Sequence, residues 1–327
     1  MPKPAPPADP RTAPATLGLA QWFHYEDAAG LGRVRGYLDE LGCTHLRTGI
    51  SWADFVRPGG EDWYRTQMRE LAGLDVLACV NFTPPSISKG GACNSPPRRL
   101  GDFADWVGQI LDLYGEFISA VELWNEPNVP VYWDYHNWDG DFRSIAIMTA
   151  GAAEECKKAG VPAVLGGISG VNHGYLGWLR GWGALQTVDV LAVHQFPGMW
   201  WPGRPAWTLP RDFRGGWEGT MTQLDRHADG RPSWVTETGF ATYDFTTAAP
   251  GLHEEQCDRL LDAAATPAGR VYWYSVEDLD PGRDAVEGFH EEEPEYHLGL
   301  VTFRGEKKPA WDVMKGLLAD QNRRAAG

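Results

Sequence analysis

VELWNEPN, residues Val121–Asn128, is the stretch that decides the fold. Its first half is an apolar run typical of a buried strand, and the run ends at Asn125 and Glu126, directly before Pro127. Because proline has no backbone N–H, it cannot continue the hydrogen-bond ladder of a central strand. The pattern predicts a buried strand that brings one carboxylate, that of Glu126, to the edge of a sheet.

An isolated Asn-Glu-Pro also occurs where a strand ends in a turn with a solvated acid, so a second carboxylate has to be located. The segment SWVTE, Ser233–Glu237, supplies one, because it is another apolar run that ends in a glutamate. Two carboxylates that face each other across a pocket are what glycoside hydrolysis requires. We therefore predict Glu126 as general acid/base and Glu237 as nucleophile, although spacing alone does not order the two roles.

Composition indicates a folded globular protein, and its charge makes a neutral ligand easier to accept than an anionic one. The chain has 327 residues, of which 43% are hydrophobic and 22% charged, and its formal net charge is -15. Nucleic acids and anionic lipid surfaces are bound by clustered Lys and Arg, so neither is an expected partner. The five cysteines are scattered without a CxxC pair, which argues against a zinc site or a dense disulfide framework. We expect no metal and no cofactor.

The beginning of the chain, residues 1–14, is rich in Pro and Ala and is predicted to be a flexible tail. It lacks the continuous apolar core of a signal peptide, and no run of about 18 apolar residues follows that could span a membrane. The expected location is cytoplasmic. A start downstream of a cleaved signal would give the same sequence, so secretion stays an alternative.

From Thr16 onward, short apolar runs alternate with amphipathic stretches of helical length, which is typical of βα units with a parallel sheet. We therefore predict one (β/α)8 TIM barrel over residues 15–327. An open doubly wound sheet is the main rival, but its GxGxxG turn is absent after the first run. Besides the opening stretch, the expected strands are 17–22, 44–49, 75–81, 163–167, 188–194, 233–237 and 271–275, and the expected helices are 31–41, 63–71, 103–114, 142–158, 175–184 and 310–318.

The carboxyl ends of the strands of such a barrel meet at one rim, where active sites lie. Glu126 and Glu237 fall on the fourth and seventh strands, on opposite sides of a ring of eight, and can face each other across its mouth. Arg47, a permanent cation, is placed to keep a nearby carboxylate ionised. Further side chains at or near the strand ends are expected to contact substrate: His24, Asn81, Asn125, His194 and Trp273.

WNEPN at Trp124–Asn128 and WVTETGF at Trp234–Phe240, together with Arg47, His194 and Trp273, resemble the clan A retaining glycoside hydrolases. The resemblance runs across nearly the whole chain after the tail. WNEPN and the closing segment HLGLVTFRGEKKPAW, residues 297–311, are most similar to family thirty-nine, the β-xylosidase and iduronidase family, with family five, the cellulase and mannanase family, next. The resemblance implies retention through a covalent intermediate, positioning by Asn125, Arg47 and His194, and a subsite floor made by Trp273.

Two positions depart from the clan pattern. A tyrosine commonly follows the strand-six histidine and bonds the nucleophile, but HQFPG has Phe196 there, so Tyr243 or a different support is expected. Family five usually has a histidine at the end of strand three, where this chain has Asn81. The second departure favours family thirty-nine over family five.

Tryptophans in the long loops after strands four and six, including Trp133 and Trp201, are predicted to pack on sugar rings as a group, although any one of them is more often loop core. Long loops around the rim favour an exo-acting retaining β-glycosidase on short oligosaccharides or glycosides, similar to a β-xylosidase. The alternatives are an endo-acting β-glycanase and, from another class, a non-catalytic carbohydrate-binding barrel. Nothing in the sequence indicates the sugar, the linkage or the oligomeric state.

Overall fold

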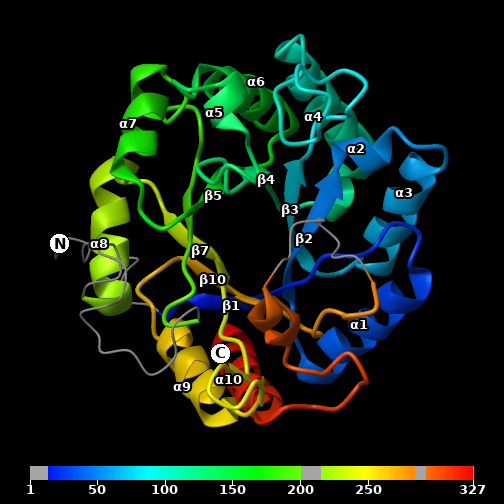
Figure 1. The fold of residues 1–327 in the computed structure, drawn as a ribbon, viewed down its shortest axis with the longest axis vertical. Helices are drawn as coiled ribbons and strands as arrows, with labels where there is room; N and C mark the ends of the chain where they lie inside the picture. The colour runs from blue at the N-terminus through cyan, green and yellow to red at the C-terminus, as the bar shows by residue number, and fades with distance from the viewer. Residues whose placement is uncertain (1–13, 200–214, 284–291, 327) are drawn as a thin grey trace, which may run out of the picture.

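The chain folds into a closed barrel of eight parallel strands surrounded by helices (Figure 1). The computed structural model describes residues 14–199, 215–283 and 292–326, so nearly all of the predicted tail, residues 1–13, lies outside the described residues. The predicted single-domain (β/α)8 barrel is confirmed. The order around the barrel is β1 (Thr16–Ala20), β10 (Arg270–Tyr274), β7 (Ser233–Thr238), β6 (Leu191–His194), β5 (Ala163–Ser169), β4 (Ala120–Asn125), β3 (Asp75–Asn81) and β2 (His45–Ser51).

Helices cover the outside of the barrel because each carries one apolar face. In α4, for example, Phe103, Val107, Ile110 and Tyr114 are buried at helical spacing. The main helices are α1 (Ala28–Leu41), α3 (Gly60–Glu70), α4 (Gly101–Tyr114), α6 (Arg143–Ala159), α7 (His173–Gly181), α8 (Gly216–Ala228), α9 (His253–Ala264) and α10 (Pro309–Ala326); the short ones are α2 (Trp52–Phe55), α5 (Tyr135–Trp138) and the 3-10 turns η2 (Gly115–Phe117) and η5 (Glu293–His297).

Three elements after the sixth and seventh barrel strands were not predicted from the sequence. The helices α8 and α9 follow β6 and β7, and a small hairpin of β8 (Tyr243–Asp244) and β9 (Ala249–Pro250) precedes α9. The buried face of α8, which includes Trp217, Met221 and Leu224, comes directly after a long segment rich in Trp and Pro, and this composition hides the start of the helical period.

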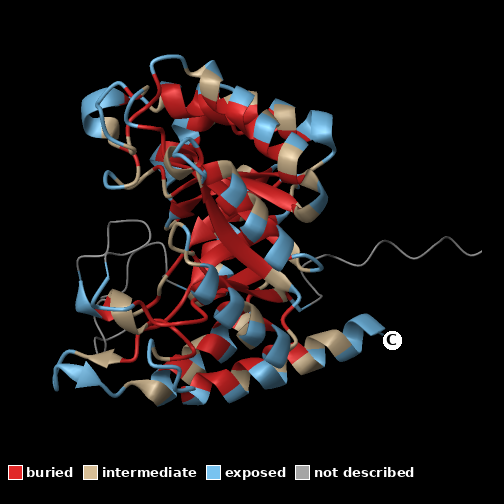
Figure 2. Cartoon of the chain, turned by 90° about the vertical axis from the view of Figure 1, so that its right-hand side faces the viewer, coloured by how far each residue is buried: buried red, intermediate tan, exposed pale blue. Residues whose placement is uncertain are grey.

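Buried side chains form two layers, one inside the barrel and one between the barrel and the helices. In Figure 2 the strands at the centre of the fold are coloured as buried almost throughout. Alternation along the strands assigns residues to these layers. In β10, Tyr272 and Tyr274 belong to the inner layer, whereas Val271 and Trp273 belong to the outer one. The inner layer fills the barrel, so functional side chains can gather only at its ends.

An ion pair spans the inside of the barrel near the amino ends of the strands. Arg270 at the start of β10 donates to both carboxylate oxygens of Asp75 at the start of β3, at 2.6 and 3.0 Å, and also to the hydroxyl of Tyr272 at 3.1 Å.

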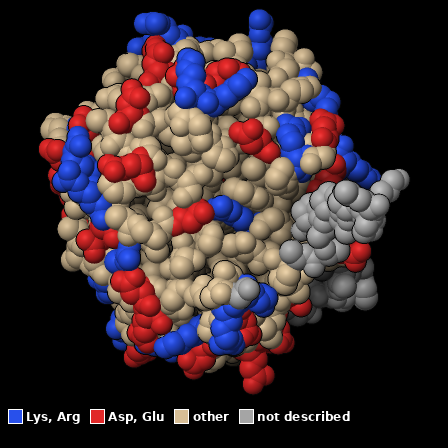
Figure 3. Space-filling view, turned by 180° about the vertical axis from the view of Figure 1, so that it is seen from behind, with Lys and Arg blue, Asp and Glu red and all other residues tan. Residues whose placement is uncertain are grey.

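On the face opposite the view of Figure 1, acidic and basic side chains are intermixed rather than gathered by sign (Figure 3). None of the described helices is long and apolar enough to cross a membrane.

Candidate active site

Arg47 lies at the centre of the site and touches groups from β4 and β7, and its Nη2 also lies 3.4 Å from Nε2 of His194 on β6. Its side chain projects from the middle of β2 into the barrel and is fully buried. Nε donates to Oε2 of Glu122 at 2.5 Å, and Nη2 donates to Oδ1 of Asn125 at 2.9 Å. Nη1 donates to Oε1 of Glu237. The predicted residues Arg47, Asn125 and Glu237 are therefore brought together, with the guanidinium as the common partner.

Glu122 is a buried site residue that the sequence reading missed. It lies in β4 at the level of Cys79 on β3, has no exposed surface, and accepts from the backbone N–H of Gly167 at 3.1 Å as well as from Arg47. Burial disfavours its charged form, but the charge of Arg47 and the contact with His194 hold the pKa of Glu122 down, to about 2. A charged residue in the apolar half of VELWNEPN was the signal that could have identified it.

His194 at the end of β6 links the two predicted catalytic glutamates. Its Nδ1 lies 3.0 Å from Oε1 of Glu126 and 3.3 Å from Oε2 of Glu237. Although burial and Arg47 favour the neutral ring, the surrounding carboxylates of Glu237, Glu122 and Glu126 raise the pKa of His194 to about 9. A proton on Nδ1 is therefore held between Glu126 and Glu237 at neutral pH.

The ring of His194 has space because position 167 is glycine. A Cβ on Gly167 would lie 2.0 Å from Nε2 of His194 and 2.7 Å from Oγ1 of Thr236. Neighbouring β5 and β6 pair in parallel beside this point, with Ser169 opposite His194. The site thus depends on glycine at position 167 of β5, because any larger residue would occupy the space of the His194 ring.

Glu126 and Glu237 converge at the rim from β4 and β7, which are three places apart in the barrel. Glu126 directly follows β4 and Glu237 lies in β7, and one carboxylate oxygen of each lies within 4.8 Å of the other. Retaining glycosidases place their two carboxyl groups about 5–5.5 Å apart, and inverting ones about 6.5–9.5 Å apart. The approach of these two oxygens fits the shorter, retaining spacing.

The backbone at the end of β4 explains how Asn125 and Glu126 reach the site. Trp124 and Glu126 have φ angles of 86° and 41°, in the left-handed region that few residues other than glycine adopt. The turn at Trp124 places its ring in the outer layer beside Leu123 instead of inside the barrel. The backbone N–H of Glu126 donates to the carbonyl of Gly167 at 2.9 Å, which fixes the strained end.

Two predicted aromatic contacts are contradicted by the structure. Trp273 is fully buried in the outer layer of β10, so it does not form the floor of a sugar subsite; Tyr274, the next residue, belongs to the inner layer. Trp133 is also fully buried, with its Nε1 donating to Asp139 at 3.0 Å and its ring packed 4.9 Å from that of Trp124. Strand alternation directs Trp273 outward, and packing within the loop after β4 buries Trp133.

The other predicted residues lie at different places. Asn81 is fully buried at the end of β3, and neither polar atom of its side chain has a partner among the described residues. His24 is half-buried and lines a cavity beyond the end of β1. Trp201 lies outside the described residues. Tyr243 stacks on His297, with the ring centroids 5.4 Å apart, and Glu237 is contacted by Arg47 and His194.

Glu126, His194 and Glu237 are also the one group of potential metal ligands found in the described part of the chain, with one ligand atom of each within 4.8 Å of the others. Metal binding needs a neutral imidazole, whereas the raised pKa of His194 favours the protonated ring. Arg47 already neutralises Glu237. The arrangement suits proton transfer and nucleophilic attack better than a bound cation.

Neither a protein-family model nor a curated protein matches the sequence. Several solved structures, however, match the fold of this chain. A family 39 glycoside hydrolase from Bacteroides cellulosilyticus WH2 has a TM-score of 0.63 at 16% identity over 95% of this chain. This chain has the fold of that hydrolase. It spans 64% of the length of that protein, less than two thirds.

Two further structures belong to the same comparison. A GH39 β-xylosidase from Caulobacter crescentus has a TM-score of 0.63 at 15% identity, over 93% of this chain and 71% of that one. A GH5_18 protein from Bifidobacterium longum subsp. infantis has a TM-score of 0.68 at 14% identity, over 94% and 79%. These three structures are of the two families that the sequence motifs resemble, and their identities to this chain establish the fold.

Proposed function

We propose that this protein is a retaining glycosidase that hydrolyses β-glycosidic bonds, with Glu126 as general acid/base and Glu237 as nucleophile. The observation that carries the proposal is the approach of these two carboxylates to within 4.8 Å at the rim of the barrel. The fold shared with family 39 and family 5 glycoside hydrolases supports it.

Each step of the reaction has a group in position. Glu237 attacks the anomeric carbon while Glu126 gives its proton to the glycosidic oxygen, so the leaving group departs as an alcohol and a glycosyl ester forms on Glu237. Glu126, now ionised, takes a proton from water, which attacks the same carbon and releases Glu237. Arg47 bonds Glu237 and pairs its charge before the attack. Retention follows from the two displacements.

His194 serves both steps from its place between the glutamates. Its Nδ1 proton can bond whichever carboxylate carries the negative charge, Glu237 before the first displacement and Glu126 after it. Asn81, whose amide is buried without a partner among the described residues, is proposed to bond a substrate hydroxyl. Short oligosaccharides or glycosides remain the proposed substrates, cleaved from a chain end as by a β-xylosidase.

The test is chemical rescue with azide. Glu237→Ala and Glu126→Ala should each remove most hydrolysis of nitrophenyl β-glycosides, whereas Glu116→Ala, a change at an exposed glutamate, should have no effect. Azide should yield an α-glycosyl azide with Glu237→Ala and a β-glycosyl azide with Glu126→Ala. Unchanged hydrolysis in both variants would rule out the assignment of the two glutamates. A parent protein that binds oligosaccharide but cleaves no aryl glycoside would favour a carbohydrate-binding barrel. Comparing the products from a polymer and from a disaccharide distinguishes exo from endo action.

A further inference from the structure

A cavity of about 350 Å³ lies at the carboxyl ends of β1 and β10. Its walls are residues 21–24 after β1, residues 277–280 after β10, the first turns of α1, and the turn at 303–305. The volume falls within the range of about 300–1,000 Å³ typical of small-ligand pockets. The catalytic pair does not line it, so the cavity is a separate compartment of the same rim.

Four of the seven charged residues in the cavity wall form ion pairs with one another. Arg33 makes a two-pronged bond to Glu277, at 2.6 and 3.0 Å, and Arg283 bonds Asp27 at 2.8 Å. A charged ligand would have to compete with these pairs. A neutral ligand with hydroxyl groups can instead bond the free lone pairs and N–H groups of the same residues, which are held in fixed positions.

Aromatic side chains supply the apolar part of the wall. Trp22 and Phe23 follow β1, and Phe303 lies across the cavity with 43% of its surface exposed. Rings of this kind pack against the apolar faces of sugars, and an exposed phenyl group in a pocket wall gains contacts when a ligand covers it. The combination of paired charges and aromatic faces fits a sugar.

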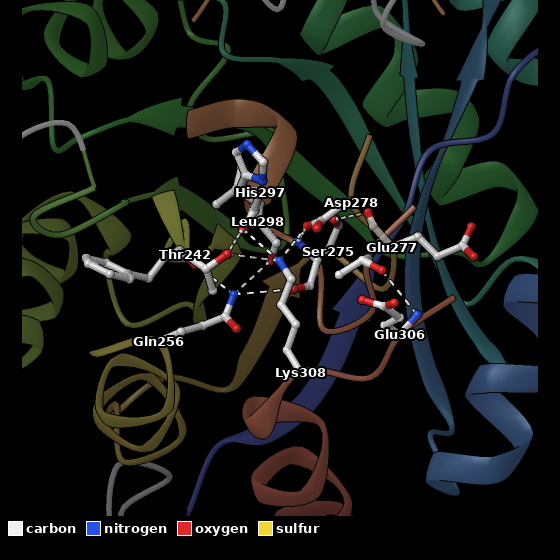
Figure 4. Close-up of polar contacts among 12 residues, drawn as sticks. Thr242, Gln256, Ser275, Glu277, Asp278, His297, Leu298, Glu306 and Lys308 are labelled. Carbon is white, nitrogen blue, oxygen red and sulfur yellow. Dashed lines mark hydrogen bonds and ion pairs between the residues drawn. The ribbon is translucent and has the colours of Figure 1, made fainter. Parts of the chain in front are cut away.

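The wall is preformed by bonds behind it. Oε1 of Gln21 accepts from the backbone N–H groups of Val276 and Glu277 at 3.1 and 3.0 Å. Behind the same segment, the buried Lys308 donates to Asp278 at 2.6 Å and to the carbonyl of His297 at 3.0 Å (Figure 4). A rigid wall lowers the entropy lost on binding.

Trp22 connects the cavity to the catalytic centre. The guanidinium of Arg47 lies over the Trp22 ring, 5.6 Å from its centroid, and Arg47 bonds Glu237. In the order of the barrel strands, β10 is next to β7, which carries Glu237, and opposite β4, which leads to Glu126. Because the general acid stands beside the leaving group, the side away from Glu126 is the non-reducing side of the cleaved bond.

We propose that this cavity binds a second, neutral sugar unit on the non-reducing side of the cleaved bond, an inference that rests on the proposed function. The preferred substrates then carry two sugars before the scissile bond, and the unit released from a chain end is a disaccharide. The aromatic wall supplies affinity, and the paired charges exclude sugar acids.

The first test compares nitrophenyl β-glycosides of xylose, glucose and mannose with those of their β-1,4-linked disaccharides. For the accepted sugar, kcat/KM should be at least tenfold higher for the disaccharide glycoside. Phe303→Ala should reduce this advantage at least threefold without affecting the monosaccharide glycoside. Phe245→Ala is the matched control, since Phe245 is 47% exposed and lies outside the cavity. An advantage that is absent, or unchanged by Phe303→Ala, would overturn the proposal.

The second test measures binding without turnover. Calorimetric titration of Glu126→Gln protein with xylobiose, cellobiose and mannobiose should give one disaccharide that binds at least tenfold more tightly than its monosaccharide, with a loss of affinity in Glu126→Gln/Phe303→Ala. If binding depends on Phe303 but the parent protein hydrolyses none of these glycosides, the proposed function is refuted and the cavity assignment is supported. Hydrolysis without any such dependence, or tighter binding of a carboxylate-bearing disaccharide, would refute the cavity assignment.

Discussion

Nε of Arg47 lies 2.5 Å from Oε2 of Glu122, and neither side chain has any exposed surface. This buried pair fixes the guanidinium from the side away from the rim. The other nitrogens of Arg47 are then directed at Asn125 and Glu237. An arginine without Glu122 would keep its charge but could turn away from the nucleophile.

Glu122→Gln should remove the charge that anchors Arg47 while leaving the shape almost unchanged. Breaking a buried pair in this way costs about 3–5 kcal/mol of stability, and we expect kcat/KM to fall on the order of tenfold or more. The pKa of Glu122 is lowered from 4.5 to about 2, so the stability it contributes is present above pH 4.5 and lost as pH falls toward 2. Urea unfolding at several pH values measures the stability difference between the parent and Glu122→Gln, with Glu116→Gln as control. Equal stabilities of the parent and Glu122→Gln at pH 7 would contradict the prediction.

The histidine between the glutamates predicts a second pH dependence. Because the pKa of His194 is raised from 6.5 to about 9, its stabilisation is complete below pH 6.5 and is lost as pH rises through 9. The difference in unfolding free energy between the parent and His194→Asn should therefore shrink across this window by on the order of 3 kcal/mol. The exposed His136→Asn is the control. A difference that stays constant from pH 6 to 9.5 would refute it.

Gly167→Ala tests the space reserved for the imidazole. The new methyl group would lie 2.0 Å from Nε2 of His194, so the ring has to move and its contacts with Glu126 and Glu237 should be lost. We expect at least a tenfold loss of kcat/KM and a stability cost of about 1–3 kcal/mol. Gly177→Ala in α7 is the control, because nothing lies within 4 Å of its Cβ position. Parent-like activity in Gly167→Ala would mean that the ring position is not critical.

The buried pair behind the cavity wall should behave as a unit. Lys308→Met leaves the buried Asp278 without its cation, which costs about 3–5 kcal/mol, whereas the double variant Asp278→Asn/Lys308→Met should cost less than the sum of the single changes. A double-mutant cycle from guanidinium unfolding measures the coupling. Additive costs would show that the two residues act independently.

Much of the architecture followed from the strand-ending motifs. Alternation of strand and helix predicted the barrel, and strand two together with the ends of strands four, six and seven placed Asn125, His194 and Glu237 around Arg47. These contacts were predictable because in a parallel barrel all carboxyl ends share one rim. The roles of Glu126 and Glu237 stay predictions that the rescue experiment addresses.

The errors have local causes. Trp273 was taken for a site residue from its place near a strand end, but strand alternation directs it outward and directs Tyr274 inward. Trp133 packs on Trp124, whose left-handed backbone conformation cannot be anticipated for a tryptophan. Glu122 was overlooked because a charge in a buried strand acquires its meaning only from a partner 75 positions away in the chain.

The ion pair between Arg270 and Asp75 closes the end of the barrel far from the site, and the inner layer fills the rest of the interior. Substrate, water and products consequently enter and leave by the same end of the barrel. In the proposed mechanism, the water that resolves the glycosyl ester enters through the space that the leaving group has just vacated. Another alcohol that occupies this space first would receive the sugar instead. The ratio of hydrolysis to sugar transfer is therefore set by competition between water and acceptor alcohols that enter at the same end of the barrel.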